Sequence, residues 1–344
     1  MAAKASASGE LYFIGEKDPI TGEDTQYLKI GIVRDQRATA SRVKDHQTSN
    51  PRQLHAVEVI KTPIVERLET TMHGKFAPMR LSGEWFCFSQ NQRDVAIATA
   101  QNFAIQAMEN VMHMERAEKF GSVASVENVL TPSSDLVEIH RTLIGLREKI
   151  RTCKSLSEVI LNALKDADKA GVDVKKMLTV QDKKGSEKFD TDLFKVQHPE
   201  LWKQFVSFDK SWKGSFLVTD PASQRPDAFS LFPELADLNG RIEEMVHAGH
   251  DHSADLHHLF LETLSLQSPA EWEKDLLEDL IKSECAENSA IDGVCKWSRS
   301  EVEKENFDKK GLKAAFPDVF AEFVSVGENT KATFLVKDLG FEVS

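Results

Sequence analysis

Apolar and polar residues alternate along short stretches of the first hundred residues, and this period of two indicates strands. The stretches are residues 10–16, 27–33, 54–62 and 83–88. Helical patterns separate them at residues 38–46 and 63–76. In the second helix Pro63 suits the first turn, and Val65, Leu68 and Met72 share one face. This order predicts a small α/β unit with a meander-like sheet at residues 9–90.

A helical pattern follows from Ser89 to about Phe120, and it predicts a connecting helix at residues 91–125. Its apolar positions include Val95 and Met108, which we expect to be buried. The fold class predicted for the whole chain is α+β. A small sheet domain comes first, and a helix-rich, duplicated module with short strands follows it.

The duplication is predicted from an internal repeat. Residues 189–220 align without gaps on residues 307–338, and 12 of the 32 aligned positions are identical. Ordinary residue usage would give about two. A spacing this long exceeds that of solenoid repeats, so we expect two copies of one domain, at 126–222 and 223–344. Each copy is expected to hold helices followed by a strand built on Phe-Leu-Val.

Composition describes an ordinary globular protein, with 41% apolar and 28% charged residues. The four cysteines form no C-x-x-C pair, which favours reduced thiols and a cytoplasmic location. Residues 1–8 lack an apolar core, so they are read as a flexible tail and not as a signal peptide. No apolar run approaches the roughly 20 residues of a membrane helix, so no membrane partner is expected.

The net charge of −12 is unevenly distributed. Residues 1–100 are close to neutral, and the acidic excess lies in the rest of the chain. A polyanion would therefore be held by the front domain or by local patches. The acidic repeats are candidates for a homo-oligomer contact or a protein partner.

Candidate chemistry gathers around the predicted sheet. Lys29 interrupts an apolar strand, and Arg42 and His46 lie four residues apart on the following helix, hence on one face. Tyr12 on the first strand and Glu69 on the second helix complete the set. A carboxylate that holds a divalent cation, an arginine that offsets phosphate charge and a group that activates water together suit phosphodiester hydrolysis.

This part of the chain resembles the GIY-YIG endonuclease superfamily. The two name-giving tripeptides correspond to the segments around Tyr12 and at Lys29–Gly31. The resemblance is closer to the virus-associated branch that has KIG in place of YIG. It rests on ordered motifs, namely KIG, Arg42, Gln47-Thr48-Ser49-Asn50-Pro51, Leu68-Glu69 with His73, and Gly83-Glu84-Trp85-Phe86, and it covers about residues 10–88.

The resemblance implies roles for single residues. Tyr12 would be the general base or orient the attacking water, and Lys29 replaces the second tyrosine. Arg42 would stabilise the phosphate, and His46 matches a neighbouring His/Tyr position. Glu69 would bind the metal, Mg²⁺ or Mn²⁺. His73 and Asn91 are further candidates for substrate binding.

Structural roles compete with these assignments. Tyr12 can be a core-edge aromatic, and Arg42 with His46, or Glu69 with His73, can be a solvated helix face. His73 can hold the loop before Gly83, and Glu84 and Trp85 read as architectural. A histidine-rich segment, residues 247–258, is open to a zinc site, although a histidine-rich loop entering a helix is favoured.

The sequence therefore predicts a metal-dependent DNA endonuclease whose C-terminal module selects the target. The alternative is an interaction protein that contacts nucleic acid or protein through a nuclease-like fold and has little or no activity.

Overall fold

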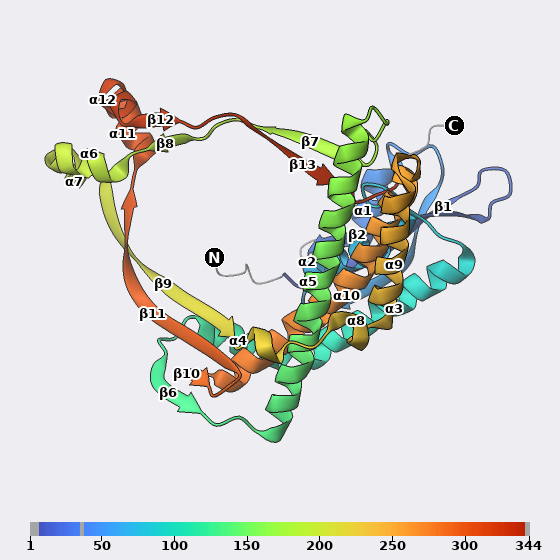
Figure 1. Cartoon of the computed structure of the whole chain (residues 1–344), viewed down its shortest axis with the longest axis horizontal. Helices are drawn as coiled ribbons and strands as arrows, with labels where there is room; N and C mark the ends of the chain where they lie inside the picture. The colour runs from blue at the N-terminus through green and yellow to red at the C-terminus, as the bar shows by residue number, and fades with distance from the viewer. Residues whose placement is uncertain (1–6, 35–37, 341–344) are drawn as a thin grey trace.

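The computed structural model describes residues 7–34 and 38–340 (Figure 1), so residues 1–6 of the predicted tail lie outside the described part. The chain is an α+β protein, as predicted, with an antiparallel sheet first and a helix-rich region with further strands after it. No helix among the described residues has the length and apolar character needed to cross a membrane.

The N-terminal sheet is fully antiparallel and has the strand order β3-β1-β2-β5-β4. Its strands are β1 (Gly9–Lys17), β2 (Asp24–Arg34), β3 (Leu54–Thr62), β4 (Arg80–Ser82) and β5 (Trp85–Cys87). The predicted meander is wrong, because β3 pairs with the far edge of β1. The run Leu11 to Ile14 is buried at every residue, as a central strand covered on both faces requires.

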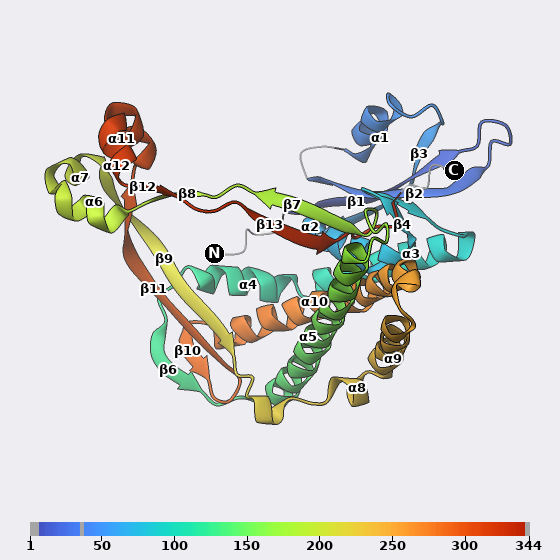
Figure 2. The ribbon, with the colours of Figure 1, turned by 45° about the horizontal axis from the view of Figure 1, so that its top comes forward.

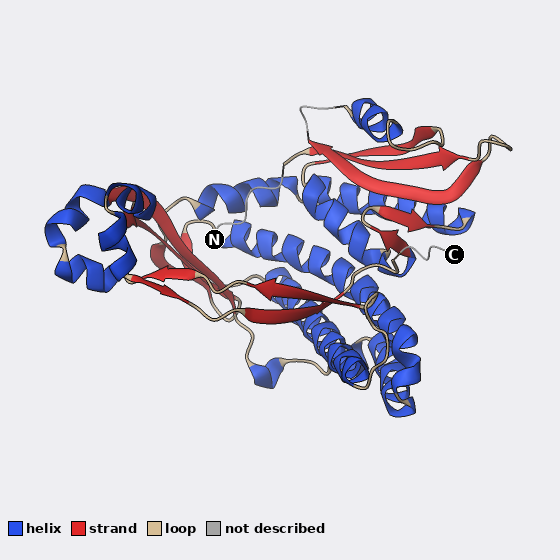
Figure 3. Cartoon of the chain, turned by 90° about the horizontal axis from the view of Figure 1, so that it is seen from above, coloured by secondary structure: helices blue, strands red, loops and turns tan. Residues whose placement is uncertain are grey.

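Helices cover both faces of this sheet (Figure 3). The short α1 (Thr39–Gln47) lies on one side, over Tyr12 and Ile14. On the other side α2 (Val65–Lys75) and α3 (Gln90–Glu109) pack on Leu11 and Phe13. Because side chains alternate along a strand, even-numbered residues of β1 face α1 and odd-numbered ones face α2.

The predicted connecting helix is two helices, α3 and α4 (Val111–Gly121), which meet at Asn110. The expected burial of Val95 and Met108 is wrong, since these side chains are 57% and 56% exposed. The buried face of α3 is a stripe of alanines, Ala96, Ala100, Ala104 and Ala107. Small side chains let the helix lie close to its neighbours, so packing overrides hydrophobicity here.

Two long helices form the centre of the remaining chain. They are α5 (Ser134–Lys169) and α10 (Ser253–Cys285), and they pack against each other. Helix α10 also completes the N-terminal core, where Trp272 lies with Leu68 and its indole Nε1 donates to Gln106 Oε1 at 2.9 Å. The elements around them are β6 (Val126–Leu130), η1 (Ala77–Met79), η2 (Ala222–Gln224), α8 (Ala228–Leu231), α9 (Pro233–Ala248), η3 (His250–His252) and β10 (Asn288–Ile291).

Two-stranded ribbons lead from these helices to a helical tip (Figure 2). One ribbon pairs β9 (Val206–Val218) with β11 (Cys295–Phe307). The other pairs β7 (Leu178–Lys183) with β13 (Thr330–Leu335), and β8 (Glu187–Phe189) with β12 (Val324–Val326). The tip consists of α6 (Thr191–Gln197), α7 (Pro199–Phe205), α11 (Lys309–Ala315) and α12 (Pro317–Glu322). The strands of the ribbons exceed the short strands expected, since β9 and β11 each have 13 residues.

The two blocks aligned in the sequence have the same element order, and their strands interlock. Phe307 pairs with Val206, and its aligned counterpart Phe189 pairs with Val324, the counterpart of Val206. Each block thus pairs with the other and not with itself, and both contribute phenylalanines to one core at the tip. Segments on either side of the predicted 222/223 boundary share sheets and a core. That the blocks arose by duplication stays a prediction.

Candidate active site

Tyr12 lies on the α1 face of the sheet, with its side chain fully buried. It faces Gly31 on β2, and a Cβ atom at Gly31 would lie 2.5 Å from the Tyr12 hydroxyl. The glycine of the KIG motif is therefore required by space, because the tyrosine ring lies across it. Burial raises the pKa of the phenol above its usual 10, although the nearby Arg42 guanidinium opposes the rise. Tyr12 is protonated at neutral pH.

Helix α1 places Arg42 and His46 on this same face, as their spacing predicts. The Tyr12 hydroxyl lies 3.4 Å from His46 Nε2. Glu10 holds the start of the helix on the sheet by accepting from the Thr39 hydroxyl at 2.7 Å. Burial, with the charges of Lys29 and Arg42, lowers the pKa of His46, so its imidazole is neutral at pH 7.

Lys29 projects from β2 on the side of Tyr12 and Gly31 and forms an ion pair with Glu84. Lys29 is only 7% exposed, and the carboxylate of Glu84 offsets the cost of burying its side chain. The ammonium in turn holds the pKa of Glu84 below its usual value, against the effect of burial. The sequence predicts an architectural role for Glu84, and its contact with Lys29 comes from the β4–β5 hairpin that lies beside β2.

Glu69 approaches the same edge from α2. Burial, followed by the negative charge of Glu84, raises its pKa to about 7. The positive charges of Lys29 and Arg80 lower the pKa of Glu69 by less than burial and Glu84 raise it. The carboxyl group therefore lacks a full counter-charge where it lies. Among the described residues no three histidine, cysteine, aspartate or glutamate side chains gather as a ready-made metal cage.

His73 is turned into the structure. Strand β5 pairs only with Tyr27–Lys29, so the next carbonyl of β2 needs another partner. His73 Nε2 supplies it, at 2.9 Å from the Ile30 oxygen. Burial lowers the pKa of His73 to about 4, which keeps the ring neutral and suited to this bond. The geometry favours the structural role that competes with substrate binding.

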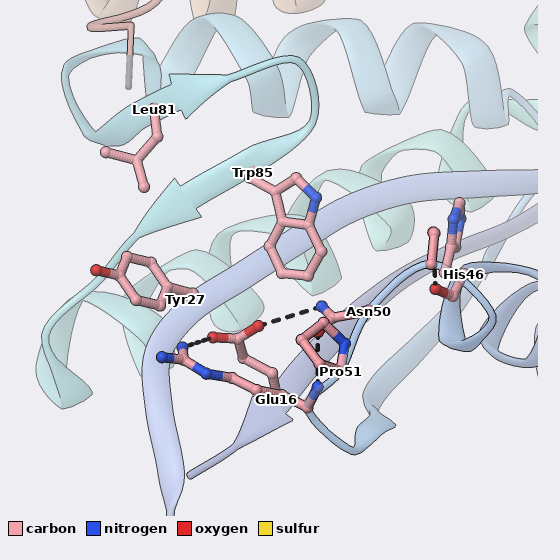
Figure 4. A pocket seen from close by; sticks show the side chains of 9 residues that line it. Glu16, Tyr27, His46, Asn50, Pro51, Leu81 and Trp85 are labelled. Atoms are coloured by element: carbon pink, nitrogen blue, oxygen red, sulfur yellow. Dashed lines mark hydrogen bonds and ion pairs between the residues drawn. The ribbon is translucent and has the colours of Figure 1, made fainter. Parts of the chain in front are cut away.

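A pocket of about 520 Å³ opens beside these residues, lined by His46, Trp85 and the turn after α1 (Figure 4). The Gln47-to-Pro51 motif builds this turn. Gln47 Nε2 donates to the Asn50 and Arg52 carbonyls at 3.0 and 2.9 Å, and Gln47 Oε1 accepts from the Leu54 amide. Glu16, buried at the base, accepts from Asn50 and pairs with Arg52.

Asn91 is not among the residues that line this pocket. It is exposed in the first turn of α3, behind the Ser89 cap, whereas Asn50 reaches the pocket from the turn after α1. In the sequence Asn50 is one position of the Gln47-to-Pro51 motif and carries no separate prediction. Its placement depends on the hydrogen bonds of Gln47, which no spacing rule predicts.

The histidines of residues 247–258 point to separate partners. His257 Nε2 lies 2.8 Å from the Val336 carbonyl, and His252 Nδ1 lies 3.0 Å from Asp255. His247 Nδ1 lies 2.6 Å from the Glu243 carbonyl one turn earlier. These contacts favour the expected histidine-rich entry to a helix over a zinc site.

A family model described as the T5orf172 domain matches residues 11–101. This phage-associated family is GIY-YIG-like, and the match spans the five-stranded sheet and the first half of α3. The N-terminal domain is therefore nuclease-like. The finer assignment to the branch with KIG in place of YIG stays a prediction. No curated protein and no solved structure matches the chain significantly.

Proposed function

We propose that the chain is a metal-dependent DNA endonuclease whose N-terminal domain hydrolyses a phosphodiester bond. The observation that carries this proposal is Glu69, a half-buried carboxyl group whose pKa is raised to about 7 and that lies near the carboxylate of Glu84 and the ammonium group of Lys29. Strongly perturbed pKa values cluster at functional sites. The family match to a nuclease-like domain supports the same reading.

The residues fit a hard divalent cation such as Mg²⁺ or Mn²⁺. Glu69 would hold it, and Glu84 is a second oxygen donor near enough to influence Glu69 electrostatically. Mg²⁺ is commonly bound by one or two carboxylates together with substrate phosphate, so a larger protein cage is not required. When bound, such an ion polarises a phosphoryl oxygen.

His46, Tyr12 and Arg42 would each have a separate role in the reaction. His46 is neutral and lines the pocket, so it is suited to accept the proton of an attacking water. Tyr12, buried and protonated, is better suited to orient His46 from 3.4 Å than to act as the base. Arg42 supplies positive charge for the phosphate as negative charge develops on it.

Incubation of the pure protein with plasmid DNA and Mg²⁺ or Mn²⁺, with and without EDTA, tests the proposal. We expect nicking or linearisation that EDTA abolishes. Glu69→Gln keeps the volume and removes the charge, so it should reduce cleavage at least about 100-fold. Glu66→Gln is the matched control, because Glu66 lies one turn earlier and pairs with Arg34 at the surface.

Full activity of Glu69→Gln would show that the carboxylate does not hold the metal. No cleavage by the wild-type protein under any divalent cation would refute the endonuclease and favour the alternative, an interaction protein with a nuclease-like fold.

A further inference from the structure

The ribbon of β9 and β11 carries two chemically different faces. Its 13 residue pairs run in continuous antiparallel register from Val206–Phe307 to Val218–Cys295. Odd-numbered residues of β9 therefore share one face with even-numbered residues of β11. We call this side the serine–lysine face. It holds Lys213, Lys296 and Lys304, one aspartate, Asp209, and otherwise mostly serines.

The opposite face carries the acidic residues and the apolar contacts. Glu301, Glu303 and Glu305 lie there, and Lys210 and the α6 residue Lys195 pair with two of them. Trp297 and Phe216 on that face pack against the helices. A chain with a net charge of −12 can thus present a locally basic surface, because the register sorts the charges by face.

The serine–lysine face is open along its length. Its residues on both strands are exposed or half-buried throughout, from Ser207 to Lys296. Within the described chain Lys213, Lys296 and Lys304 form no ion pair, in contrast to the lysines on the other side. Asp209, opposite Lys304, is the only carboxylate in the register of this face. Lysines among hydroxyl groups are the side chains that contact phosphate oxygens in protein–DNA complexes.

The dimensions of the ribbon also suit a duplex. Thirteen residues at about 3.3 Å each extend over roughly 40 Å, a little more than one helical turn of B-DNA. A two-stranded ribbon is narrow enough to enter the major groove. Lys331, the counterpart of Lys213 in the sequence alignment, pairs with Asp182 on the other ribbon, so the ion-pair-free state of Lys213 in the described chain belongs to the β9–β11 ribbon.

We propose that the serine–lysine face binds the phosphate backbone of duplex DNA and so gives the protein much of its affinity for its substrate. This inference rests on the proposed function and names the surface through which the C-terminal module acts. The main-chain bond from the Leu339 amide to the Arg80 carbonyl, 2.8 Å, ties the end of β13 to β4 beside the candidate site. The β9–β11 ribbon joins this attached ribbon through the shared core of the helical tip.

The test measures binding of the full-length protein to a labelled duplex of about three helical turns in EDTA, where no cleavage occurs. The variant Lys213→Gln/Lys296→Gln/Lys304→Gln removes the charges of the face. Lys154→Gln/Lys169→Gln/Lys203→Gln is the matched control, since it removes three exposed, ion-paired lysines elsewhere.

We expect the face variant to bind roughly 10- to 100-fold more weakly, and its salt dependence to be shallower by about 2.7 in log–log slope, or 0.9 per lost phosphate contact. The control should retain affinity and slope. Replacing the same three lysines by arginine should restore binding, which separates charge from folding. Loss of binding in the arginine variant as well would refute a phosphate contact.

Equal affinity and slope for the face variant and the control would overturn the proposal. So would a wild-type protein that binds only single strands, RNA or a protein. These results concern binding alone. If the wild-type protein cuts DNA in Mg²⁺ but the face variant binds DNA normally, the proposed function stands and the proposed role of the serine–lysine face is refuted.

Discussion

The nuclease-like sheet and the β9–β11 ribbon both place lysines on antiparallel strands, yet the lysines are in opposite physical states. Lys29 is nearly buried and paired with Glu84. Lys213 stands in water without an ion-pair partner in the described chain. Chemistry requires the first state, since charges interact strongly away from water. Recognition of duplex DNA requires the second, since an ammonium group without an ion pair can replace a counterion at a phosphate.

The difference extends to stability. Around Tyr12 the groups are packed so closely that Gly31 has no room for a Cβ atom. On the serine–lysine face of the ribbon the side chains are exposed or half-buried. We therefore expect substitutions in the sheet to change both stability and activity, and substitutions on the serine–lysine face to change binding alone.

The largest effect we expect comes from Arg42→Gln, which removes the cation that we propose faces the phosphate. Cleavage of plasmid DNA should fall by about 10²- to 10³-fold, because charge stabilisation by one donor has that size in other enzymes. Lys44→Gln, on the exposed side of the same helix, is the control and should cut almost normally. An Arg42 variant with normal rates would remove this residue from the site.

The second-largest effect we expect is steric, and it compares a glycine of the sheet with a glycine of the ribbon. Gly31→Ala should lower the free energy of unfolding by about 1–3 kcal/mol, because the new methyl group overlaps Tyr12. Gly214→Ala on β9 meets only ordinary contacts at 3.4 Å and should be neutral or slightly stabilising. Denaturant unfolding of both variants measures the difference. Equal losses would contradict the contrast drawn between the two regions.

The pH dependence of stability isolates Glu69. Its folded pKa of about 7 exceeds the unfolded value near 4.5, so between these values the native state binds more protons. Without added metal, raising the pH from 4.5 to 7 should cost the wild-type protein about 1–3 kcal/mol relative to Glu69→Gln. Saturating Mg²⁺ or Mn²⁺ should return that stability to the wild type only. Parallel pH profiles of the two proteins would contradict the assignment.

The smallest expected effect is the stability change of the triple lysine variant on the serine–lysine face. Its free energy of unfolding should stay within about 0.5 kcal/mol of the wild type, because exposed side chains without partners contribute little. Thermal unfolding at one salt concentration measures it. A larger loss would mean that the face supports the fold and is not free for a ligand.

Cutting the chain after residue 120 would separate the N-terminal domain from the C-terminal module. Surface variants distinguish the roles of these two parts more clearly. Trp272 and Leu276 of α10 belong to the core of the N-terminal sheet. A front fragment would expose this core, so poor cleavage by it would report on folding and not on targeting.

Much of the N-terminal domain could be predicted from the sequence alone. The strand and helix positions follow from alternation and periodicity, which depend only on neighbouring residues. The four-residue spacing places Arg42 and His46 on one helix face. That Tyr12 and Lys29 share one side of the sheet depends on the register of β1 with β2. The family match at residues 11–101 agrees with the motifs from which the nuclease-like domain was inferred.

Only the tertiary structure decided the rest, because the deciding contacts join distant segments. Lys29 and Glu84 are 55 positions apart, and the sequence carries no local signal that they meet. His73 reads as a candidate ligand until the carbonyl of Ile30, left open by the short β5, is seen to need it. The alanine face of α3 and the exchange of strands between the aligned blocks likewise depend on which surfaces meet, and periodicity along a chain does not contain that information.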